Sequence, residues 1–109
     1  MSKKEIVIDE YDLVIKTLKK MGYKTTDKRD RNRNGSDIYA IANDRVLSVE
    51  IKRAVAGKGL NVLRVRKVEM GRRGDDLIAI VLPSNYVLVE PMRDHLLACN
   101  KTGDRFLNY

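Results

Sequence analysis

Two neighbouring stretches of the chain, residues 35–41 and 46–52, constrain the fold most strongly. β-Branched and aliphatic residues dominate both stretches, and the turn-forming pair Asn43-Asp44 separates them. This pattern predicts two β-strands joined as a hairpin. Because side chains alternate along a strand, one face of the hairpin is expected to be wholly apolar. The residues expected on that face are Ile38, Ala40, Leu47, Val49 and Ile51.

Charged side chains gather at the open end of the predicted hairpin. With Asn43 and Asp44 as the two central turn residues, antiparallel pairing places Asp37 directly opposite Glu50. Lys52 follows Glu50 by two positions and therefore points to the same side. Like charges opposite each other destabilise a sheet, so a cation is expected between the two carboxylates. Besides the Lys52 ammonium, an oxygen-liganded Mg²⁺ or Mn²⁺ ion fits such a site, and this arrangement can hydrolyse a phosphodiester.

The length and composition narrow the class of protein. A chain of 109 residues is expected to form one domain over residues 1–109. The sequence has no apolar run of membrane-spanning length and no secretory signal pattern, so we expect a cytoplasmic protein with no membrane partner. Cys99 is the only cysteine and His95 the only histidine. This excludes an internal disulfide and a cysteine-based zinc site, and a packing role is expected for both residues.

The charge balance points to a polyanionic partner. The formal net charge is +7, and a basic domain of this size is expected to bind nucleic acid. With no tryptophan and one phenylalanine, the chain lacks the aromatic platform on which single-strand binders stack bases. Residues 27–35 form a polar, basic loop that is either a solvated surface segment or a grip on phosphates. The residues expected to hold a nucleic-acid backbone are Lys28, Arg29, Arg31, Arg33, Lys58, Arg72 and Arg73.

The remaining pattern predicts an α/β fold. Apolar residues at helical spacing predict a helix over residues 8–21, ended by Gly22, and a last short helix begins at Pro91. A buried strand is expected where six apolar residues run together. The other expected elements are strands at 23–26, 60–65, 77–82 and 86–90, a connection at 53–59, a short helix at 66–73, and a tail at 104–109 that packs on the body or forms a dimer contact. Together they predict a central mixed sheet of about five strands flanked by helices.

The Gly35-Ser36-Asp37 segment, its spacing to Glu50-Ile51-Lys52 and the order of the expected elements resemble the PD-(D/E)XK nuclease superfamily. The chain most resembles small archaeal-type Holliday junction resolvases, and less closely virus-type replication-repair nuclease domains. The resemblance implies a restriction-endonuclease-like core and a Mg²⁺-dependent endodeoxyribonuclease in which Mn²⁺ can substitute. It further implies duplex or branched DNA as the substrate, a role in DNA recombination or repair, a homodimer, no small-molecule cofactor, and a prokaryotic, archaeal or viral origin.

Carried over to this chain, the resemblance assigns roles to the residues at the open end of the hairpin. Asp37 and Glu50 resemble the metal-binding carboxylates, and the main-chain carbonyl of Ile51 resembles the usual backbone ligand. Lys52 resembles the residue that positions or deprotonates the attacking water. These four residues are therefore the expected centre of the active site.

Glu10 matches an additional acidic residue that many members of the superfamily use in catalysis and metal binding, and Asp9 is its competitor. The alternative for either residue is a helix first turn, where acidic side chains are favoured. Two other functions remain open, a non-catalytic basic DNA-binding module on the same fold and an RNA-cleaving nuclease. The intact site residues argue against the module, whereas nothing in the sequence reads the 2′-hydroxyl.

Overall fold

The computed structural model describes residues 10–26, 38–59, 62–68 and 74–108. In chain order the elements are α1 (Glu10–Lys20), β1 (Lys24–Thr26), β2 (Ile38–Ala42), β3 (Arg45–Arg53), β4 (Val55–Ala56), β5 (Val62–Val65), β6 (Leu77–Leu82), the 3₁₀ turn η2 (Pro83–Asn85), β7 (Tyr86–Pro91), α2 (Met92–Ala98) and β8 (Arg105–Asn108). None of the helices within these ranges is long and apolar enough to cross a membrane.

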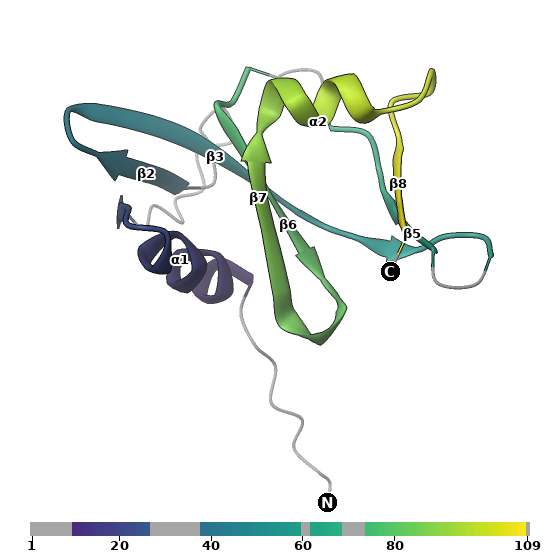
Figure 1. The fold of residues 1–109 in the computed structure, drawn as a ribbon, viewed down its shortest axis with the longest axis horizontal. Helices are drawn as coiled ribbons and strands as arrows, with labels where there is room; N and C mark the ends of the chain where they lie inside the picture. The colour runs from purple at the N-terminus through teal and green to yellow at the C-terminus, as the bar shows by residue number, and fades with distance from the viewer. Residues whose placement is uncertain (1–9, 27–37, 60–61, 69–73, 109) are drawn as a thin grey trace, which may run out of the picture.

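A five-stranded sheet in the order β1-β2-β3-β6-β7 forms the centre of the fold (Figure 1). β3 and β6 run parallel, whereas the other neighbouring strands are antiparallel. α1 packs on one face of this sheet and α2 on the other. The predicted α/β fold, with a mixed five-stranded sheet flanked by helices, is therefore confirmed.

The β2–β3 hairpin has the predicted register. Ile38 pairs with Val49, and the pairing continues in step to Ala42 and Arg45. Asn43 and Asp44 form the turn, and Asn43 adopts a φ of 55°, a left-handed conformation that asparagine tolerates better than most residues. The described pairing ends at Val49, while β3 itself continues to Arg53.

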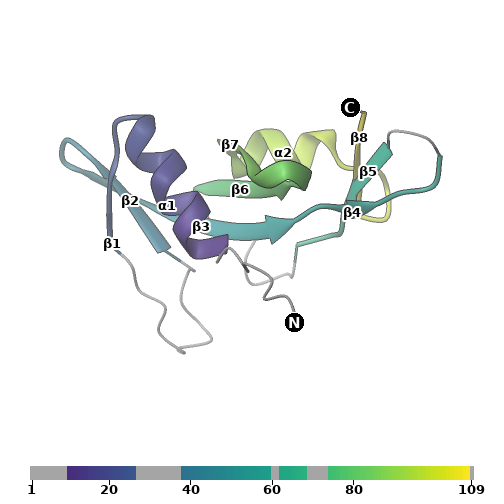
Figure 2. The ribbon, with the colours of Figure 1, turned by 90° about the horizontal axis from the view of Figure 1, so that it is seen from below.

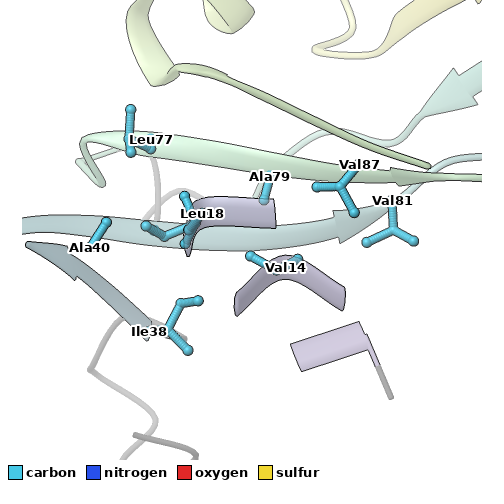
Figure 3. Close-up of a cluster of buried hydrophobic side chains, with 9 residues drawn as sticks. Val14, Leu18, Ile38, Ala40, Leu77, Ala79, Val81 and Val87 are labelled. Atoms are coloured by element: carbon cyan, nitrogen blue, oxygen red, sulfur yellow. The ribbon is translucent and has the colours of Figure 1, made fainter. Parts of the chain in front are cut away.

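The two faces of the central sheet bury separate sets of apolar side chains. On the face we call the α1 face, Val14 and Leu18 of α1 pack against apolar residues of β2, β3, β6 and β7 (Figure 3). On the opposite face, called the α2 face, Ile78 and Ile80 pack with Met92 of α2 and with residues of β5. β6 thus supplies both cores, as expected of a strand buried on both sides.

α1 ends as the sequence predicts. The Tyr23 amide donates to the Leu18 carbonyl and the Gly22 amide to the Lys19 carbonyl, with Gly22 at a φ of 101°. This pair of hydrogen bonds is a Schellman motif, which turns the chain directly into β1. The helix begins at Glu10 in the described part of the chain, and residues 8 and 9 of the predicted helix lie outside it.

A second sheet was not predicted. β4, β5 and β8 form three antiparallel strands in that order, gathered at one end of the molecule (Figure 2). The predicted connection at 53–59 therefore contains a strand. Of the two alternatives for the tail, packing on the body is observed, because residues 105–108 form β8, and a dimer contact is untested. The inward residues Leu63, Val65 and Leu107 belong to the core of the α2 face, and this burial holds the small sheet in place.

Two smaller predictions differ from the structure. Residues 66–68, at the start of the predicted middle helix, are not helical, and residues 69–73 lie outside the described part of the chain. Pro91 does not occupy the first helical position. It ends β7, pairs with Leu77, and caps α2, which begins at Met92.

Candidate active site on the central strand

Glu50 and Lys52 project from the α2 face of β3. Val49 belongs to the core under α1, so the alternation of side chains turns Glu50 and Lys52 to the opposite side. The parallel register agrees, because it places Glu50 beside Ile78 and Lys52 beside Ile80, both of which belong to the core of the α2 face. The structure thus brings the predicted carboxylate and ammonium together on one face of a central strand.

Glu50 is buried, with 5% of its surface exposed, and Lys52 is half-buried. A buried carboxylate is costly unless cations or hydrogen-bond donors surround it, and Glu50 does take part in a polar or electrostatic interaction. A charged residue on an exposed strand costs little free energy, whereas a charged residue at the buried position of Glu50 costs much more. The burial of Glu50 therefore favours a specific functional role over that of an ordinary surface charge.

Asp37, the predicted partner of Glu50, lies outside the described residues. The register observed from Ile38 to Ala42 is the one from which the Asp37–Glu50 pairing was predicted. The pairing of the two carboxylates itself stays a prediction. Asp9 also lies outside the described residues.

Glu10 lies at the start of α1 and forms an ion pair with Arg53, whose Nε donates to Glu10 Oε2. Arg53 pairs with Val81, which belongs to the core under α1, so this ion pair lies on the α1 face. Glu50 and Lys52 project from the other face. In the structure, Glu10 thus pairs with Arg53 on the face opposite to Glu50 and Lys52. A role of Glu10 in the active site stays a prediction.

Of the residues predicted to hold a nucleic-acid backbone, the structure places one. Lys58 is exposed in the segment that joins β4 to β5. The others lie outside the described ranges; they are Lys28, Arg29, Arg31, Arg33, Arg72 and Arg73.

The oxygen donors predicted for the metal are only partly described. Across residues 10–26, 38–59, 62–68 and 74–108, no group of three or more His, Cys, Asp or Glu side chains is arranged to hold a metal ion. Asp37 lies outside those ranges. The donors that are described, the buried Glu50 carboxylate and the Ile51 carbonyl, are hard oxygen atoms of the kind that Mg²⁺ and Mn²⁺ prefer.

A second polar cluster on the α2 face was not predicted as a unit. Arg105 of β8 donates to both oxygens of Glu90 on β7, and its Nη1 lies 3.4 Å from Nδ1 of the fully buried His95. The Cys99 thiol lies 3.7 Å from Nε2 of His95 and donates to the His95 carbonyl. The expected packing role of His95 and Cys99 agrees with this arrangement. Sequence reasoning missed the cluster because Arg105 reaches it only through β8.

The electrostatics of this cluster are those of a structural contact. Burial lowers the pKa of His95, the adjacent Arg105 lowers it further, and Glu90 acts in the opposite direction. The hydrogen bonds from Arg105 to Glu90 raise the pKa of the guanidinium, which stays charged. A neutral imidazole beside a fixed ion pair joins β7, α2 and β8.

The comparisons with known proteins find similarity in structure and none in sequence. No protein-family model matches the chain, and no curated protein sequence matches it. The structure is similar to that of a bacterial homing endonuclease, I-Ssp6803I, with a TM-score of 0.70 and 16% sequence identity over 90% of this chain and 69% of that one. At this identity the likeness shows a shared fold, and the fold is one that a nuclease uses.

Proposed function

We propose that this chain is a metal-dependent DNA endonuclease of the PD-(D/E)XK type. The observation that carries the proposal is the placement of Glu50 and Lys52, two positions apart on one face of the central strand β3. A buried carboxylate beside an ammonium suits phosphodiester hydrolysis, in which negative charge accumulates on phosphate oxygens. A solved structure with a similar fold is that of a homing endonuclease, which supports DNA as the substrate, and so does the net charge of +7.

The residues that would hold Mg²⁺ or Mn²⁺ are Asp37, Glu50 and the Ile51 carbonyl, with Glu10 or Asp9 as a further candidate. When bound, such an ion lowers the pKa of a water molecule and neutralises charge on the scissile phosphate. Lys52 lies beside Glu50, where its ammonium can orient the attacking water or contact a phosphate oxygen. The basic side chains hold the nucleic-acid backbone through contacts that weaken as salt concentration rises.

A cleavage assay with paired variants tests the proposal. Labelled duplex, flap and four-way-junction DNA are incubated with the protein in Mg²⁺, in Mn²⁺ or in EDTA. We expect cleavage with either metal and none in EDTA. Glu50→Gln, Asp37→Asn and Lys52→Ala should each slow cleavage by about a hundredfold or more, because each removes a group that acts on the reacting phosphate.

Matched controls separate catalysis from folding and binding. Asp94→Asn removes an exposed carboxylate from α2, and Lys16→Ala removes an exposed ammonium from α1. Both controls should cleave at the wild-type rate, and the site variants should still bind the same DNA in EDTA. The proposal would be wrong if the protein bound the substrates but cleaved none of them. It would also be wrong if Glu50→Gln retained full activity.

The same assay decides the finer points. Faster cleavage of the junction than of the duplex would support a resolvase-like preference, and RNA of the same sequence tests the RNA-cleaving alternative. Sedimentation at several protein concentrations tests the proposed homodimer. Glu10→Gln and Asp9→Asn are compared separately, and the variant that loses metal-dependent cleavage identifies the additional acidic residue.

A further inference from the structure

The outer face of the small sheet carries a cross-strand row of three side chains. Val55 of β4 pairs with Arg64 of β5, and Arg64 pairs with Phe106 of β8. Residues directly opposite in antiparallel strands project from the same face. The row therefore places one aromatic ring and one guanidinium side by side across the sheet.

This row faces away from the core. The alternating residues Leu63, Val65 and Leu107 face the core of the α2 face. Phe106 is 51% exposed, and the Arg64 side chain is 40% exposed. Phe106 is the only phenylalanine of the chain, and half of its surface is in contact with water, although burial would stabilise it.

The surroundings of the row are cationic. Lys58, Arg66, Lys67 and Lys101 are exposed in the segments that form or flank the small sheet. Among the described residues of those segments, 54–59, 62–68 and 99–108, Asp104 is the one acidic residue, and it is buried. The small sheet and the segments beside it thus offer positive charge with little exposed negative charge, which favours an anionic partner.

Asp104 fixes the guanidinium of the row. Its Oδ2 accepts a 2.7 Å hydrogen bond from Nη2 of Arg64, and its Oδ1 accepts one from the Lys67 amide. The Arg64 hydrogen bond lowers the pKa of Asp104, so the carboxylate remains charged and holds Arg64. A guanidinium held by this hydrogen bond samples fewer rotamers than a free one.

The row also lies next to the candidate active site along the chain. Ala54 alone separates the end of β3 from β4, so Val55 follows Lys52 by three positions. Figure 2 shows β3 running from the β2–β3 turn into the end of the molecule where β4, β5 and β8 gather. The small sheet is therefore joined by a single residue to the strand that carries Glu50 and Lys52.

We propose that the outer face of the small sheet binds one unpaired nucleobase of the nucleic-acid substrate, which stacks on Phe106 while Arg64 and its neighbouring cations contact the adjoining phosphates. The proposal rests on the proposed function for its substrate class. Aromatic rings stack on any base, and arginine adds a cation–π contact or a phosphate contact. With one phenylalanine present, the site accommodates a single base and differs from the extended aromatic platforms of single-strand binders. A second copy of the chain is a poorer occupant, because it would bring the same cations to the interface.

A tryptophan reporter tests the stacking directly. The chain contains no tryptophan, so Phe106→Trp introduces a single indole at the proposed site. Titration with oligothymidine in EDTA should quench its emission, whereas a fully paired hairpin duplex should not. Tyr86→Trp is the matched control, because Tyr86 is an exposed aromatic residue of the central sheet, and its emission should not respond.

Affinity measurements give a second readout in the same buffer. Phe106→Leu should weaken oligothymidine binding about tenfold, the loss typical of one stacked base. Phe106→Tyr should retain the affinity, because it retains the ring. The proposal would be overturned if oligothymidine did not quench Phe106→Trp, or if the duplex quenched it equally. Equal quenching of Tyr86→Trp would also overturn it, and so would a wild-type affinity of Phe106→Leu for oligothymidine. Quenching that rises with protein concentration alone would assign the face to a second copy.

The outcomes distinguish this proposal from the proposed function. EDTA removes the metal, so the titrations report binding without cleavage. Failure of the cleavage assay with a quenched Phe106→Trp reporter would leave a base-binding module without nuclease activity. If cleavage depends on Glu50 but the emission of Phe106→Trp does not change, the proposed nuclease function stands and the proposed base site is refuted.

Discussion

A single proton on His95 is expected to affect the stability of the fold. Its imidazole is fully buried between Cys99 and the Arg105–Glu90 ion pair. Burial, followed by the Arg105 charge, lowers its pKa below 6.5, against the opposing influence of Glu90. The folded protein therefore disfavours the protonated form, while the unfolded chain accepts the proton at the ordinary pKa.

We expect the free energy of unfolding to fall as the pH drops below about 6.5. Below that value the unfolded chain binds a proton that the folded imidazole does not, so protonation favours unfolding. His95 is the only histidine of the chain, so His95→Gln should make the free energy of unfolding nearly independent of pH between about 5.5 and 7.5. Urea unfolding followed by circular dichroism at several pH values measures this. An equal pH dependence in the wild type and the variant would contradict the assignment.

The candidate site was predictable at the residue scale where local alternation decides the geometry. The side shared by Glu50 and Lys52 follows from strand periodicity, and the structure confirms it. The contact between Arg105 and Glu90 was not predictable, because it joins residues of two strands whose relative placement no local pattern specifies. The ion pair of Glu10 with Arg53 likewise joins a helix and a strand whose relative placement no local pattern specifies.

Among the elements, α1 depends on the glycine that ends it. Gly22 has a φ of 101°, and a Cβ atom added there would meet nothing within 4 Å. The cost of a side chain at this position is therefore conformational and not steric crowding by a neighbour. This makes Gly22 a clean probe of the Schellman motif between α1 and β1.

Gly22→Ala should destabilise the protein by about 1 kcal/mol, because alanine disfavours the left-handed conformation. Gly74→Ala is the control, since its Cβ would also meet nothing within 4 Å and its φ lies outside the left-handed region. That control should stay within about 0.5 kcal/mol of the wild type. Chemical denaturation compares the two variants, and equal losses would mean that the φ value of Gly22 is not what matters.

Elements with strong local signals were predicted, and those without them were missed. The hairpin has a turn signal at Asn43-Asp44 and apolar alternation on both sides, and β6 has six consecutive apolar residues. β4 contains two residues, and β8 contains four whose partners lie in β5, far away in sequence. Such strands form because tertiary packing stabilises them, so a local pattern does not reveal them.

The molecule as a whole combines an excess of positive charge with a sheet that places a carboxylate in its interior. The net charge of +7 acts over the whole surface and attracts any polyanion. The buried Glu50 acts only at short range. Affinity and chemistry are therefore expected to separate experimentally, with salt concentration affecting the first and site substitutions the second.

Binding to duplex DNA in EDTA should weaken steeply as salt concentration rises. Lys58→Gln should reduce the slope of log affinity against log salt by about 1, because it removes one phosphate contact. Lys19→Gln, which removes an exposed charge from α1, should leave the slope unchanged. Fluorescence anisotropy at several salt concentrations measures both slopes, and an equal decrease in the two variants would show that Lys58 contributes only to the general charge.

The pairing of β5 with β8 also has a consequence for the order of folding. β5 (residues 62–65) pairs with β8 (residues 105–108) across a long stretch of chain, whereas only a two-residue turn separates β2 from β3. Closing the longer loop costs more chain entropy, so we expect the small sheet to form late and to open first. Amide hydrogens of β8 should then exchange with solvent before those of β6, as NMR or mass spectrometry can measure. A chain that is still folding would thus have its central sheet before the face that carries Phe106 forms. A chain under strain would lose that face while it keeps the central sheet.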